Sequence, residues 1–180
     1  MTFDISARFL ERSRYYLGVE YPAKLRRALL AIPPDRLWWR PHDSANSAGN
    51  LVLHLSGNVR QWVVSGIGGA ADVRTRDAEF AARDGLSAER LLETMEKTLS
   101  EADAVLASLS ARSLGETRDI QGRHTTVFAA IYHVVEHFST HTGQIILLAK
   151  MLAPGAIRFY EDDGGLARPT FLGDGRSDIE

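Results

Sequence analysis

The sequence contains no cysteine among its 180 residues. Chemistry that needs a thiol of the chain itself is therefore excluded, namely a cysteine nucleophile, cysteine-ligated zinc or an internal disulfide. Any metal must be held by His, Asp or Glu side chains. The six histidines are consequently the first candidates for a functional site.

Neither sign of charge is in large excess. The sequence has 21 Lys and Arg against 23 Asp and Glu, for a formal net charge of -2. Such a chain has no global field that attracts nucleic acid or an anionic membrane surface. No run approaches the roughly 18 apolar residues of a membrane helix, and the first residues are too charged for a signal peptide. We expect a cytoplasmic protein with neither nucleic acid nor a membrane as its partner.

Four stretches have the apolar spacing of amphipathic helices. They cover about residues 6–30, 47–67, 87–109 and 125–151. Ser47 and Ser87 are the expected N-caps of the second and third helices, and Pro22 is expected to kink the first. Because no segment has the alternating pattern of a strand, the sequence predicts an all-α fold, a four-helix bundle over residues 1–153.

Glycine and proline concentrate after the last of these helices. Residues 154–180 are therefore predicted to form an irregular C-terminal tail. Two connections, 31–46 and 110–124, are longer than is usual between neighbouring helices of a bundle. A simple up-down-up-down order is thus not implied.

The last predicted helix carries His133, His137 and His141, each four residues from the next. At about 100° per residue these side chains share one face of the helix, with Gln144 in the same arc. Two imidazoles four residues apart on a helix can bind one metal ion. The spacing of the histidines therefore predicts a metal site on this helix.

The second predicted helix is nearly all apolar, yet one polar stripe runs along it. The stripe consists of Ser47, Asn50, His54, Asn58 and Gln61. Burying polar groups without partners costs about 1–3 kcal/mol each, so we expect the stripe to face the histidines of the last helix. One His from this helix and two from the last would make a three-His site with an open coordination position, as in catalytic zinc sites.

Other interpretations of the histidines stay open. Residues 133–137 spell H-x-x-E-H, in which His133 and His137 would be ligands and Glu136 a general base, but such peptidases take a third, acidic ligand from far downstream. A di-iron site needs Glu-x-x-His on paired helices, which the second and fourth helices lack. The histidines can also form a hydrogen-bonded seam with a purely structural role.

The segment NSAGNLVLHLSGNVRQW, followed later by HVVEHFSTHTGQIILL, resembles the DinB/YfiT-like superfamily of metal-binding four-helix bundles. The resemblance covers roughly residues 5–152 and points to a subgroup of unknown function. It implies that His54, His137 and His141 bind the metal, whereas His133 lines the pocket or hydrogen-bonds a ligand. The residues expected to bind a ligand beside the metal are His133, Gln144, Asn58 and Gln61.

What the resemblance implies about function is a nucleophile activated by a metal. Members of the superfamily include transferases that add a low-molecular-weight thiol (bacillithiol, mycothiol or glutathione) to an electrophile, a thiol-dependent isomerase, and proteins described as metal-dependent hydrolases. A divalent metal lowers the pKa of a bound thiol or water, and all-imidazole ligation favours zinc or nickel. We therefore expect thiol transfer to a small-molecule substrate, with a hydrolase or a non-catalytic metal- or ligand-binding protein as alternatives.

Assembly is a further expectation. Homodimers are common among proteins that resemble this one. The aromatic loop at Trp38 and Trp39, together with the Gly-rich tail, offers surface for such a contact. The sequence thus predicts a C₂ homodimer.

Overall fold

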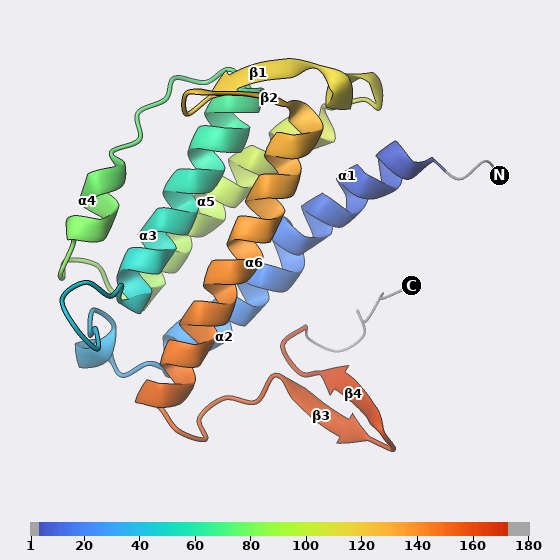
Figure 1. Ribbon diagram of the computed structural model, residues 1–180. Coiled ribbons are helices and arrows are strands. Elements are labelled where there is room, and N and C mark those ends of the chain that lie inside the picture. The colour runs from blue at the N-terminus through green and yellow to red at the C-terminus, as the bar shows by residue number, and fades with distance from the viewer. Residues whose placement is uncertain (1–3, 173–180) are drawn as a thin grey trace.

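The computed structural model describes residues 4–172 and confirms the all-α fold (Figure 1). The end of the predicted irregular tail, residues 173–180, lies outside the described residues. The helices and π-helical segments of the bundle are α1 (Ile5–Tyr15), η1 (Tyr16–Glu20), α2 (Tyr21–Ala31), α3 (Ala48–Val59), η3 (Arg60–Ile67), α5 (Ala88–Ala107) and α6 (Val127–Leu152). Outside the bundle lie the 3-10 turns η2 (Pro34–Arg36) and η4 (Arg112–Gly115) and the short helix α4 (Arg76–Ala81). No helix within residues 4–172 is long and apolar enough to cross a membrane.

The first helix accommodates Pro22 without a break. Proline has no N–H to donate and its ring crowds the preceding turn, so a regular α-helix resists it. Here the π-helical segment η1 precedes it, and Tyr21 N–H bonds to the carbonyl of Tyr16, five residues back. The wider turn takes up the irregularity, as π-bulges do in other helices.

The two long connections join helices across the diagonal of the bundle. The continuous helix from α1 to α2 packs against α5 and α6, and α3 packs against the same two. Each helix contributes a side chain with no exposed surface to the shared core: Leu25, Leu55, Met95 and Phe138. This arrangement sets α3 beside α6, which is the pair that carries the histidines (Figure 1).

Two β-hairpins that the sequence analysis did not predict lie at opposite ends of the bundle (Figure 1). Strands β1 (Thr117–Ile120) and β2 (Arg123–Thr126) form the first, and β3 (Tyr160–Asp163) and β4 (Leu166–Pro169) form the second. Each has a two-residue turn with both residues at positive φ, Gln121-Gly122 in one and Gly164-Gly165 in the other. Such turns suit glycine and match the twist of antiparallel strands.

Trp38 packs against other residues of its own chain rather than standing free. Its ring lies against Gly49, where an added Cβ would come within 2.8 Å of the ring, and its indole N–H donates to the carbonyl of Leu86 at 3.1 Å. The loop thus anchors the start of α3 to the segment before α5. The homodimer stays a prediction, with less free aromatic surface than the sequence suggested.

Candidate metal centre

Three histidines meet between α3 and α6. His54 of α3 is 5% exposed, and the candidate ligand atoms of His54, His137 and His141 all lie within 4.8 Å of one another. The Nε2 atoms of His54 and His137 face each other at 3.1 Å. Two nitrogens on one tetrahedral zinc, each about 2.0–2.1 Å from it, would be about 3.3 Å apart. The cluster therefore has the donor type and spacing to hold one metal ion.

Ser47 and Asn50 anchor the start of α3, the helix that carries His54. Ser47 and Asn50 form a capping box that starts α3, with Ser47 Oγ accepting from the backbone N–H of Asn50 at 3.1 Å. The Asn50 side chain also donates to the carbonyls of Glu79 and Ala82, at 2.9 and 2.8 Å. This end of the polar stripe therefore binds α4 and its C-cap, not the histidine face as the sequence analysis expected.

A buried ion pair holds the far side of the His54 ring. Arg74 donates to the Glu79 carboxylate through Nε and Nη2, at 2.7 and 2.8 Å, and the Nδ1 of His54 lies 3.0 Å from Glu79 Oε2. The donor Arg74 Nη2 also lies 3.1 Å from this Nδ1, but it already donates to Glu79 Oε2 at 2.8 Å. Because the Glu79 oxygen can only accept, we assign the His54 proton to Nδ1. The Nε2 lone pair then faces the other two histidines. A carboxylate that orients a ligand histidine in this way is a common feature of metal sites.

Glu79 stays ionised in this position. Burial by itself would raise the pKa of the Glu79 carboxyl, but the hydrogen bonds from Arg74 and His54 outweigh burial and hold that pKa below its ordinary value. The side chains of Arg74 and Glu79 are only 4% and 11% exposed. The negative charge of Glu79 is thus available to support a metal ion bound at His54.

Gly57 makes room for this carboxylate. A Cβ added at Gly57 would lie 1.9 Å from Glu79 Oε1 and 3.0 Å from Arg74 Nε. We predict that Gly57→Ala displaces Glu79 and weakens metal binding about 10–100-fold, as loss of other outer-shell partners does. Metal titration checks this, with Gly18→Ala as the matched control because nothing lies within 4 Å of a Cβ there. Unchanged affinity in Gly57→Ala would contradict the proposed role of Glu79.

The two candidate ligands on α6, His137 and His141, are prepared to bind a metal as neutral imidazoles. His141 Nδ1 donates to Gln144 Oε1 at 2.7 Å, which leaves its Nε2 lone pair free. Burial, joined by the charges of the neighbouring histidines, lowers the pKa of His137 to about 3. Burial lowers the pKa of His141 as well, against the hydrogen bond to Gln144, which raises it. Protons therefore compete weakly for these nitrogens at neutral pH.

His133 lies beside the cluster but not in it. Its ring lies tilted against that of Trp62, with centroids 4.3 Å apart, and the three-His group does not include it. Glu136 is exposed. This geometry disfavours the H-x-x-E-H interpretation, which would require His133 as a ligand and Glu136 as a base.

The other residues expected to bind a ligand differ in whether their side chains already have hydrogen-bond partners. Asn58 is buried, and its Oδ1 has no hydrogen-bond partner within the described residues. Gln61 is engaged by Asp72 and Arg74, at 2.8 and 2.9 Å. Gln144, as described, holds His141. A role for these residues and His133 in binding a ligand stays a prediction.

Arg74 and Glu79 are functional candidates that the sequence analysis missed. They belong to the connection between the second and third predicted helices, to which the sequence analysis assigned no element. The hint in the sequence is Gly57, a glycine inside a buried helix, which often marks a close approach of another segment.

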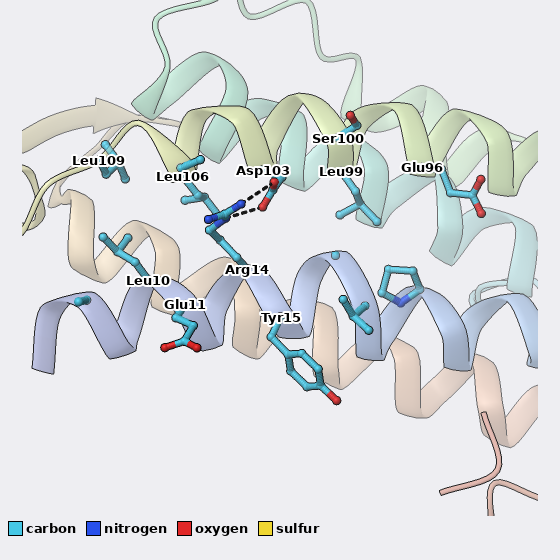
Figure 2. Close-up of a pocket in the computed structure, with 15 residues that line it drawn as sticks. Leu10, Glu11, Arg14, Tyr15, Glu96, Leu99, Ser100, Asp103, Leu106 and Leu109 are labelled. Atoms are coloured by element: carbon cyan, nitrogen blue, oxygen red, sulfur yellow. Dashed lines mark hydrogen bonds and ion pairs between the residues drawn. The ribbon is translucent and has the colours of Figure 1, made fainter. Parts of the chain in front are cut away.

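A groove lies elsewhere, between α1 and α5 (Figure 2). Its volume is about 740 Å³, and its walls carry Leu10, Leu99 and Leu106. Arg14 crosses it to Asp103 in a bidentate pair, at 2.6 and 2.9 Å. The groove contains no histidine. A cavity alone therefore does not mark the site, and the chemistry favours the three-histidine cluster.

The bundle and its three-His cluster define a helical protein with a candidate metal centre. The sequence matches the model of the family described as "Protein of unknown function (DUF1572)" over residues 4–159, so the chain belongs to that family. The description of this family agrees with the subgroup of unknown function to which the motifs pointed. Comparison with curated proteins gives no significant match.

Two solved structures are similar to this chain. One is the DinB-like protein YjoA of Bacillus subtilis, with a TM-score of 0.62 at 18% identity over 86% of this chain and 97% of that one. The other is a DinB-like protein of Bacillus cereus, with a TM-score of 0.57 at 18% identity over 76% of this chain and 91% of that one. At this identity the likeness establishes the fold alone.

Proposed function

We propose that this protein is a metal-dependent transferase in which His54, His137 and His141 hold zinc or nickel and a low-molecular-weight thiol is transferred to a small electrophile. The observation that carries the proposal is the meeting of three imidazoles from two helices, two of which have outer-shell partners. When bound, the metal would lower the pKa of a thiol and present it as a thiolate.

The acids near the site favour a thiol over water as the nucleophile. Both oxygens of Glu79 are occupied by Arg74 and His54, so this carboxylate is not free to take a proton from substrate. Glu136 is exposed and outside the cluster. A thiol, with an ordinary pKa near 8.5, needs less help from a base than water does. Since the chain has no cysteine, the thiol comes from a co-substrate.

Turnover of a fluorogenic alkyl halide with a panel of small thiols tests the proposal. We expect thioether formation that requires both added thiol and added metal, and that is lost in His54→Ala. The matched control is His124→Ala, since His124 is exposed on the β1–β2 hairpin, where it contacts Asp119.

Parallel assays of ester and amide hydrolysis separate the alternatives. Metal-dependent hydrolysis that ignores added thiol would contradict thiol transfer and indicate a hydrolase. No turnover in either assay would contradict catalysis and favour a protein that only binds a metal or a small ligand.

A further inference from the structure

A second pocket lies on a different face of α6, between α2, α6 and the start of the C-terminal hairpin. Its volume is about 630 Å³. The residues that α6 contributes include Ser139, Thr142, Ile146 and Lys150, which recur at three- and four-residue spacing. At about 100° per residue they turn away from the arc of the three histidines. This pocket is thus separate from the metal centre.

The charges around this pocket are all of one sign. Lys24, Lys150 and Arg158 line it, and no Asp or Glu does. Lys24 is paired with Glu20 at 2.5 Å, whereas Lys150 and Arg158 make no ion pair within residues 4–172. In a chain of net charge -2, two unpaired cations at one pocket favour an anionic ligand.

A buried hydroxyl in the wall lacks a partner. Thr142 is 3% exposed, and its Oγ1 has no hydrogen bond within the described part of the chain. A buried donor left unsatisfied costs about 1–3 kcal/mol, and a helical threonine usually bonds the carbonyl four residues back instead. A ligand in the pocket that Thr142 lines would supply the missing partner.

The rest of the wall is apolar or aromatic. Tyr21, Ile146, Ile157 and Phe159 contribute it. Sites for small organic molecules typically measure about 300–1,000 Å³ and combine apolar walls with a few polar groups. A bare inorganic ion would leave this wall uncovered.

We propose that the pocket binds a small organic anion, with a carboxylate or phosphate group at Lys150, Arg158 and Thr142 and an apolar body against Tyr21 and Ile157. The site does not depend on the metal centre. A carboxylate and a phosphate ester share the chemistry recognised here, and the experiment distinguishes them.

Calorimetric titration of the full chain, freed of metal with a chelator, tests the proposal with three matched probes. These are 1-naphthoate, 1-naphthyl phosphate and 1-naphthylmethylamine, and inorganic phosphate is the fourth titrant. We expect one or both anions to bind with a Kd of about 1 mM or tighter, and at least about tenfold more tightly than the amine or inorganic phosphate. Equal binding of the anions and the amine would overturn the proposal.

Variants then locate the binding. Lys150→Ala/Arg158→Ala should weaken the preferred anion at least about tenfold, while Lys97→Ala/Arg112→Ala, which removes two exposed cations elsewhere, should leave it unchanged. Thr142→Val should weaken it and Thr142→Ser should restore it. Affinity that Lys150→Ala/Arg158→Ala leaves unchanged would overturn the assignment. Because the titrations use metal-free protein, they do not depend on the outcome for the metal centre.

Discussion

Replacing His54, His137 or His141 with alanine is expected to abolish tight binding of zinc or nickel. Each change removes one of three imidazoles whose ligand atoms lie within 4.8 Å of one another. Loss of an outer-shell partner alone costs about 10–100-fold in metal affinity, so loss of a ligand should cost on the order of 10³-fold or more. Competition titration against a chromophoric chelator measures this.

The neighbouring histidine provides the control. His133→Ala should keep the affinity within about tenfold of the unchanged protein, because the ring lies against Trp62 and outside the three-His group. Circular dichroism of each variant separates lost binding from lost folding. If His133→Ala lost the metal and His141→Ala kept it, the assignment would be wrong and the H-x-x-E-H interpretation would regain support.

Replacing Glu79 with alanine is expected to produce two large effects. The variant should bind metal about 10–100-fold more weakly, because His54 loses the carboxylate that fixes its proton at Nδ1. It should also lose about 3–5 kcal/mol of unfolding free energy, because Arg74, 4% exposed, is left as an unpaired buried cation. Metal titration and denaturant unfolding of the metal-free protein measure the two separately.

A second substitution distinguishes the two roles of Glu79. Glu79→Ala/Arg74→Met removes the unpaired charge and should recover most of the stability, yet metal affinity should stay low. Glu79→Gln, which keeps an acceptor for His54 Nδ1, should recover part of the affinity. Recovery of full metal affinity in Glu79→Ala/Arg74→Met would show that Glu79 acts only on stability.

The bundle and the three-histidine cluster could be predicted because both depend on local spacing. The apolar periodicity of residues 127–152 predicts a helix without reference to its packing partners. A step of four residues then puts His137 and His141 on one face of that helix. His54 lies in the middle of a buried helix, where a polar side chain needs a partner. These rules need no knowledge of distant contacts.

The outer part of the site could not be predicted in this way. Nothing near Glu79 distinguishes it from a surface acid, and α4 is only six residues long. Its burial is decided by distant partners: the Asn50 amide that binds its carbonyl and the space left by Gly57. Interactions this far apart in the chain have no local signature in one sequence.

The hairpins were missed for a different reason. Their strands have four residues each, too few to show alternation. A pair of glycines such as Gly164 and Gly165, both at positive φ here, is compatible with a two-residue hairpin turn and with an irregular chain alike. The residues flanking the glycines, rather than the glycines themselves, decide between the two.

The metal content of the protein purified without a histidine tag tests the central claim most directly. After equilibration with zinc or nickel and removal of free metal, we predict about one ion per chain in the unchanged protein and in His133→Ala. The ion should be absent from His54→Ala. An unchanged protein that retains no metal under these conditions, while folded, would contradict a metal centre at His54, His137 and His141.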